Sequence, residues 1–155
     1  MIGSLLAACA SPGLAHAITA HTPSVLFVCQ FGTVKSAISR EVFRRRAAKR
    51  NIAIAAFSRG IIMEDHPLSP ELLQQLGADG IDPNADPATI LTAADWMRAD
   101  VLIWFNSLPP EVNHSAMRDW SDLPSFNDSF ALARPILERR IDALLDELSG
   151  LTHQT

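Results

Sequence analysis

The chain has 155 residues, 48% of them hydrophobic and 19% charged, which suits one globular domain with a single core. Its formal net charge of -4 excludes a general nucleic-acid binder, because such proteins need a concentrated positive surface. One basic cluster occurs on a predicted helix and is interpreted as its solvated face: Arg44, Arg45, Arg46, Lys49 and Arg50.

The first 23 residues have the composition of an exported leader. No Lys, Arg, Asp or Glu occurs in the first 34 residues, and residues 2–10 are apolar or small. This run is too short to span a bilayer, whereas Ala15-His16-Ala17 has the small-x-small form of a signal-peptidase site. We therefore expect a signal peptide that is cleaved after Ala17, and a periplasmic or otherwise exported protein.

Two other interpretations of these residues stay open. The stretch Leu6-Ala7-Ala8-Cys9 resembles a bacterial lipoprotein box, in which Cys9 would carry a lipid anchor. Alternatively, residues 1–23 are an N-terminal extension of a cytoplasmic protein. Neither interpretation includes a membrane span.

Downstream of this stretch, the chain alternates strand and helix patterns. Residues 24–29 form a continuous apolar run, typical of a strand buried on both faces of a parallel sheet. A short loop at 30–35 precedes a predicted helix over 36–50, and residues 52–57 supply the next strand. The order strand, helix, strand predicts a βαβ unit.

The remaining segments complete one α/β domain over residues 24–150, followed by a tail over 151–155. We expect two further strands, of which the first is buried, at 100–105 and 117–120. We expect three further helices, of which the last is long and amphipathic, over 70–76, 88–93 and 129–148. No internal repeat or second domain is visible in this sequence.

The loop from Cys29 to Ser36 carries the predicted chemistry. It joins a strand to a helix N-terminus, where outward-pointing backbone N–H groups and the helix dipole favour a bound anion. Gly32 tolerates the positive φ that a loop curled around one point requires. An isolated cysteine at the end of a buried strand is most often a core residue. Here, however, the amides, Lys35 and Ser36 would stabilise the thiolate of Cys29, which makes it a candidate nucleophile.

The spacing Cys29-x5-Lys35-Ser36 resembles the Cys-x5-Arg-Ser/Thr signature of tyrosine phosphatases. Its position directly after the first strand is specific to the low-molecular-weight protein tyrosine phosphatases and their arsenate reductase relatives. Residues 58–60 are similar to the family's Ser-Ala-Gly after the second strand, and the resemblance extends in order over residues 24–149. It implies a three-layer α/β/α fold around a four-stranded parallel sheet, phosphotyrosine protein phosphatase I-like.

The resemblance also implies hydrolysis of phosphomonoesters, including protein phosphotyrosine, through a cysteinyl-phosphate intermediate. Cys29 would attack phosphorus, Lys35 and the loop amides would stabilise the equatorial oxygens, and Asp122 would protonate the leaving oxygen. Asp122 has the position most similar to the family's Asp-Pro acid, and Asp119 is the second choice. The residues expected to bind phosphate are those of the loop: Gln30, Phe31, Gly32, Thr33, Val34 and Ser36.

Four departures from the family pattern bear on activity. Lys35 replaces an arginine whose planar fork holds two phosphoryl oxygens at once. Gly32 replaces an asparagine that also tolerates a left-handed conformation, and Phe31 replaces a small residue at the pocket mouth. In addition, Leu123 separates Asp122 from Pro124, where the family has Asp-Pro. Lys35 and this altered Asp-Pro leave one alternative, a catalytically weak relative that binds phosphate or a phosphopeptide. Arsenate reduction is a further alternative, but it needs additional cysteines, and none follows Cys29.

The sequence indicates no cofactor. Its His and carboxylate residues show no metal-ligand spacing. His66, which precedes Pro67, is interpreted as a surface loop residue, and Trp120 as a core residue or a wall of the site. The expected partner is a phosphorylated protein or small molecule, and the oligomeric state stays open.

Overall fold

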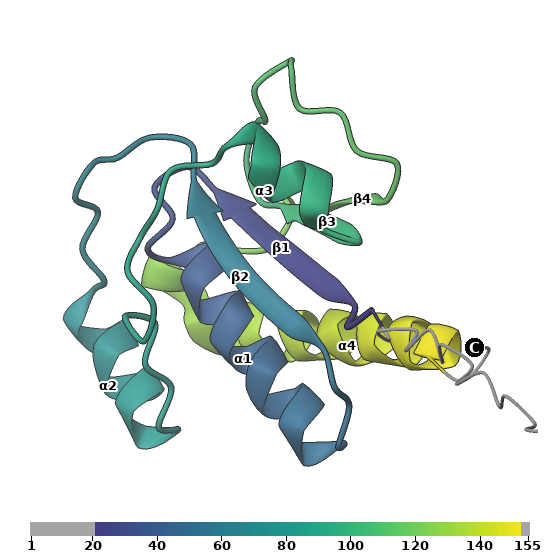
Figure 1. Cartoon of the computed structure of the whole chain (residues 1–155). Helices are drawn as coiled ribbons and strands as arrows, with labels where there is room; N and C mark the ends of the chain where they lie inside the picture. Colours follow the sequence, from purple (N-terminus) through teal and green to yellow (C-terminus); the bar gives the residue numbers. More distant parts are fainter. Residues whose placement is uncertain (1–20, 153–155) are drawn as a thin grey trace, which may run out of the picture.

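A parallel sheet of four strands organises the part of the chain that the computed structural model describes, residues 21–152. The strands, in the spatial order β2-β1-β3-β4 (Figure 1), are β1 Ser24–Cys29, β2 Ala55–Gly60, β3 Val101–Trp104 and β4 Met117–Asp119. β1 pairs with both β2 and β3, and all six of its residues are buried. The prediction of a central strand from its continuous apolar run is therefore confirmed.

Helices cover both faces of this sheet, so the molecule has the predicted three layers (Figure 1). Along β1, Val25 and Phe27 face the larger apolar cluster, whereas Leu26 and Val28 face a smaller one. Two helices on one face pack against each other, α1 Lys35–Lys49 and α4 Phe126–Thr152. A third contacts α4, α2 Pro70–Ala78, and the opposite face carries the short helix α3 Ala93–Arg98.

Two predicted elements lie elsewhere along the chain. The strand predicted over 52–57 begins at Ala55, because the chain first turns after α1 through Asn51, whose φ is 55°. Ile52 and Ile54 pack partly buried against the core, so their hydrophobicity reports burial rather than strand pairing. The helix predicted over 88–93 is also displaced.

The segment before α3 is extended, and one of its residues pairs with the end of β2. Gly60 forms an isolated parallel bridge with Ile90, and its amide donates to the carbonyl of Thr89 at 2.9 Å. The helix begins only after Thr92, whose side chain and backbone both bond to Asp95 in a capping box. The capping residues, rather than the apolar pattern, therefore set the start of α3.

The closing helix starts earlier than predicted and contains a break. α4 begins at Phe126, and Ser129 has non-helical backbone angles of φ −148° and ψ 40°. The helix continues through Thr152, so part of the predicted tail over 151–155 is helical. Among the described residues, no helix is both long and apolar enough to cross a bilayer. The predicted cleavage site at Ala17 and lipid-anchor residue Cys9 lie outside the described residues.

The basic cluster on α1 is exposed at three of its five residues, as its sequence predicted, but it also forms ion pairs with α4. Arg46 donates to the carboxylate of Asp142 at 2.8 Å, and Arg50 pairs with Asp146, both acidic residues belonging to α4. These ion pairs neutralise two of the five predicted basic charges at the interface between α1 and α4. Both acidic partners lie on α4, so the spacing of residues within α1 could not reveal these ion pairs.

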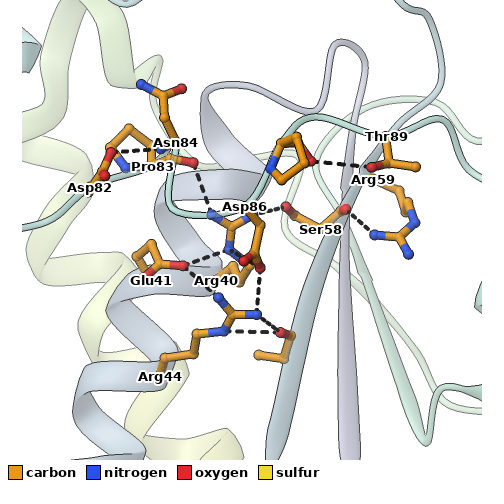
Figure 2. A network of polar contacts seen from close by, with 12 residues as sticks. Arg40, Glu41, Arg44, Ser58, Arg59, Asp82, Pro83, Asn84, Asp86 and Thr89 are labelled. Carbon is orange, nitrogen blue, oxygen red and sulfur yellow. Dashed lines mark hydrogen bonds and ion pairs between the residues drawn. The ribbon is translucent and has the colours of Figure 1, made fainter.

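A buried arginine connects α1 to the sheet (Figure 2). Arg40 is 1% exposed and donates to the Ser58 hydroxyl at 2.7 Å and to the Pro83 carbonyl at 2.9 Å. Its Nε donates to Glu41 at 2.7 Å, and Glu41 also accepts from Arg44 at 2.9 Å. The network fixes α1 against β2 close to the strand's carboxyl end, because a buried charge needs all its partners in place.

Candidate active site

The loop between β1 and α1 lies at the carboxyl edge of the sheet, at the point where successive connections lead to opposite sides of β1. From β1, the connection through α1 leads to β2 on one side, whereas β3 lies on the other side. In open α/β sheets, ligands bind in the crevice outside the carboxyl ends of strands at such a switch point. The loops that follow β1 and β3 are therefore the expected walls of a site.

Cys29 ends β1 at this edge and lies beside the first turn of α1. Its side chain is 5% exposed, and its Sγ lies 3.0 Å from the hydroxyl oxygen of Ser36, which is fully buried. The helix has Val34 at its N-cap and no acidic residue in its first turn, so no side chain occupies its positive end. The structure thus brings together the predicted nucleophile and the predicted supporting hydroxyl.

The backbone amides of the loop are available to a ligand. The amide of Gln30 donates to the side-chain oxygen of Asn106 at 3.2 Å, which anchors the start of the loop to the end of β3. Within residues 21–152, the amides of residues 31–36 have no hydrogen-bond acceptor. Several N–H groups without a partner at a helix N-terminus form a binding site for an anion.

Glycine is required at two contacting positions of this loop and β2. Gly32 has a φ of 73°, as predicted, and a Cβ there would lie 2.8 Å from the amide nitrogen of Gly60. A Cβ at Gly60 would lie 2.7 Å from the carbonyl carbon of Phe31. Gly60, the last residue of β2, therefore supports the loop directly.

Lys35 points toward the segment before α4. Its Nζ donates to the carbonyl oxygen of Leu123 at 2.7 Å and lies 5.9 Å from the ring centroid of Phe126. Burial lowers the pKa of Lys35, and the negative charges of Cys29 and Asp122 partly oppose that shift. Its ammonium group is thus engaged by the protein at the position where the family signature has an arginine.

A small cavity opens at the loop. It measures about 130 Å³, below the roughly 300–1,000 Å³ typical of pockets for drug-sized ligands, so it suits one small group. The predicted residues that line it are Cys29, Gln30, Phe31, Thr33, Val34 and Lys35. The lining residues that sequence reasoning did not assign to the site are His66, Asn106, Ser125, Phe126 and Asn127.

Asp122, the predicted general acid, does not line this cavity. Its side chain is 68% exposed, and both its carboxylate oxygens accept hydrogen bonds from Arg140, at 2.8 and 2.6 Å. The hydrogen bond from Arg140 lowers the pKa of Asp122, which opposes the protonated state that a general acid needs. Asp119, the second choice, accepts a hydrogen bond from the Ser121 amide at 2.8 Å and is also absent from the lining.

Two of the unassigned residues had recognisable positions in the sequence. Asn106 follows β3 by two residues, so a polar side chain at a strand's carboxyl end was available as a signal. His66 lies in the loop before α2, and its ring stacks on that of Phe31 with centroids 4.6 Å apart. Trp120 is buried, and its ring centroid lies 6.2 Å from that of Phe27, so it is a core residue.

Comparisons with known proteins agree on the fold. No protein-family model matches the chain, and no curated protein matches it significantly. YfkJ from Bacillus subtilis superposes with a TM-score of 0.70 at 22% identity, over 85% of this chain and 98% of that one. An arsenate reductase in the phosphate binding state gives 0.62 at 23% identity, over 81% and 98%. The tyrosine phosphatase Wzb from Escherichia coli K30, in complex with sulphate, gives 0.61 at 18% identity, over 83% and 99%.

At these identities the likeness shows the fold. Several of the similar structures are named low molecular weight protein tyrosine phosphatases and one is named an arsenate reductase, and nearly the whole length of each is covered. The predicted resemblance and the predicted α/β/α architecture with a four-stranded parallel sheet are therefore confirmed at the level of fold.

Proposed function

We propose that this protein is a phosphatase-like hydrolase of phosphomonoesters that works through a cysteinyl-phosphate intermediate. One observation carries the proposal: the Cys29 sulfur lies 3.0 Å from the Ser36 hydroxyl, at a loop whose amides at 31–36 have no acceptor among the described residues. A thiolate and an anion-binding loop at one point are the two components that attack on a phosphoryl group requires.

In the proposed reaction, the Cys29 sulfur attacks phosphorus, so a phosphorus–sulfur bond forms while the bond to the leaving oxygen breaks. The loop amides hold the equatorial oxygens, and Lys35 adds positive charge once its ammonium exchanges the Leu123 carbonyl for a phosphoryl oxygen. Asp122 is the predicted proton donor, and to act it has to leave Arg140. Water then attacks phosphorus while Asp122 accepts its proton, the phosphorus–sulfur bond breaks, and inorganic phosphate and the Cys29 thiolate are released.

The proposed substrate class is a phosphorylated protein or small molecule, with phosphotyrosine as one member. A cavity of about 130 Å³ takes the phosphoryl group and leaves the rest of a large substrate outside. The name of the similar structure from T. tengcongensis, a low molecular weight protein tyrosine phosphatase, supports this class. The structures of the fold solved with sulphate and with benzylphosphonate support an anionic ligand.

A second candidate function is binding of phosphate or a phosphopeptide with little turnover. Two observations favour it: Lys35 donates to the protein's own backbone, and Asp122 is bound by Arg140 away from the cavity. Arsenate reduction is supported only by the fold of one similar structure. Within residues 21–152, Cys29 is the one cysteine, so a thiol cascade would need a thiol from elsewhere.

The two candidates differ in turnover, which one assay measures. The full chain is incubated with para-nitrophenyl phosphate across pH, beside Cys29→Ser, Lys35→Arg and Asp122→Ala. A working phosphatase loses activity by at least about a thousand-fold in Cys29→Ser. It keeps or gains activity in Lys35→Arg, and loses part of it in Asp122→Ala.

Other results would change the assignment. Silence of the wild type with activity in Lys35→Arg supports the binding protein, because the arginine fork restores the missing grip on the phosphoryl group. Activity that survives in Cys29→Ser would overturn the cysteinyl mechanism.

A further inference from the structure

His66 is held against the anion cavity by the loop itself. His66 is among the cavity-lining residues, and its ring stacks on that of Phe31, which also lines the cavity, with ring centroids 4.6 Å apart and an interplanar angle of 19°. Its backbone carbonyl accepts a hydrogen bond from the Thr33 hydroxyl at 3.1 Å. The imidazole is therefore positioned by two residues of the loop that binds the anion.

The ring nitrogens of His66 are available to a ligand. In the part of the chain that the structure describes, neither nitrogen has a hydrogen bond or an ion pair. The two other described histidines differ: His21 bonds both carboxylate oxygens of Asp100, and His114 bonds the Ala99 carbonyl. Among these three, His66 alone has its donor capacity unused at a cavity.

The cavity needs positive charge beyond what Lys35 supplies. The Lys35 ammonium donates to the Leu123 carbonyl at 2.7 Å, and burial lowers the pKa of Lys35. No arginine is among the lining residues. A phosphoryl dianion is bound best by charge-assisted hydrogen bonds, of which a protonated imidazole can donate one from each nitrogen.

The charged and titratable groups around His66 are few. From the loop and the start of α1, Cys29 and Lys35 share the cavity with it, and from the start of α4 the lining residues 125–127 are uncharged. Glu64 and Asp65 precede it in the chain and are exposed, outside the lining.

We propose that His66 is a second cationic ligand of the anion cavity, so that protonation of its imidazole controls how tightly the cavity binds a dianion. The proposal rests on the proposed function only in taking this cavity as the anion site, and it does not depend on turnover. Imidazole changes its charge between about pH 5 and 8, the range in which binding would change.

Sulfate is the probe, because it remains a dianion over this range and is not hydrolysed. The full-length Cys29→Ser protein is used, because the substitution removes the Cys29 thiol, whose ionised form would repel sulfate. Calorimetric titrations at about pH 5.5 and pH 8 measure the dissociation constant. We expect binding to be about ten-fold tighter at the lower pH, the effect of one charge-assisted hydrogen bond.

Two variants and a control isolate His66. In the same background, His66→Gln is expected to bind weakly at both pH values, and His66→Lys tightly at both, because its charge is fixed. His21→Gln is the control: an exposed histidine that bonds Asp100, so the pH dependence should persist. Circular dichroism checks that each variant is folded.

The outcomes separate this proposal from the proposed function. No sulfate binding at either pH would overturn the anion site itself. Binding that is equal at both pH values, or a pH dependence that persists in His66→Gln, would overturn only the role of His66. Binding in His66→Lys that still weakens at high pH would overturn it as well.

Discussion

The two walls of the cavity are built in different ways. The wall from Cys29 to Ser36 is one contiguous segment, fixed by backbone contacts at Gly32 and by a thiol–hydroxyl contact of 3.0 Å. The facing wall belongs to the segment 119–127, which leads from the edge strand β4 into α4 and lines the cavity with residues 125–127 alone. One long side chain links the two: Lys35, at the start of α1, donates to the Leu123 carbonyl of this segment.

This difference separates the two halves of the proposed chemistry. The main-chain amides that contribute to anion binding have positions set by the backbone, so this contribution is in place before any side chain moves. Proton transfer to the leaving oxygen depends on one side chain in one rotamer, and Asp122 is held by Arg140. The proposed anion site is therefore preformed, whereas the proposed proton donor, Asp122, lies away from it.

The largest expected effect comes from breaking the rigid wall with Gly32→Ala. The new Cβ would lie 2.8 Å from the Gly60 nitrogen, at a backbone φ of 73° that disfavours any side chain. We expect a loss of roughly 2 kcal/mol or more in the free energy of unfolding, measured in urea, and loss of sulfate binding.

Gly77→Ala is the matched control for this substitution. Gly77 lies in α2, and a Cβ there would meet nothing within 4 Å. Alanine is the better helix former by about 0.8–1 kcal/mol, so this variant should be more stable than the wild type. A Gly32→Ala protein as stable as wild type, with intact sulfate binding, would show that the loop can move.

The rigid wall was predictable because its parts are adjacent in the sequence. A cysteine, a glycine and a serine at fixed spacing between a strand and a helix specify the loop, and the positive φ of Gly32 followed from its curvature. The facing wall was not predictable in this way. The partner of Asp122 is Arg140, eighteen residues later and one helix away, and no spacing rule selects it.

Long-range contacts explain the other differences as well. The position of His66 at the cavity was not predictable, because its stacking partner, Phe31, lies 35 positions earlier and belongs to another loop. The burial of Arg40 could not be predicted either, since its hydrogen-bond partners, Ser58 and the Pro83 carbonyl, come from separate segments (Figure 2). Local pattern predicts elements and loops, whereas side-chain partners across the sheet depend on tertiary packing.

A smaller effect is expected when the thiol loses its hydrogen bond, in Ser36→Ala. The Ser36 hydroxyl lies 3.0 Å from the Cys29 sulfur, within reach to donate a hydrogen bond to it. Alkylation of Cys29 by iodoacetamide near neutral pH, followed by mass spectrometry, should slow by about five-fold, the effect of one ordinary hydrogen bond. Ser39→Ala is the control, since the Ser39 hydroxyl is buried in the same helix without a partner among the described residues. Equal rates in both variants would remove Ser36 from the proposed site.

The smallest effect is expected for Arg140→Gln, which tests the contact that holds Asp122 away from the cavity. The hydrogen bond from Arg140 lowers the pKa of Asp122, so the stabilisation it gives is present above the ordinary aspartate pKa and is lost as pH falls through the folded value. Without Arg140, the Asp122 carboxylate should titrate at higher pH, which carbon NMR of the side chain measures. Arg139→Gln, at an exposed neighbour on α4, is the control. If both variants leave the Asp122 titration unchanged, the ion pair does not form in solution, and Asp122 is already free to approach the cavity.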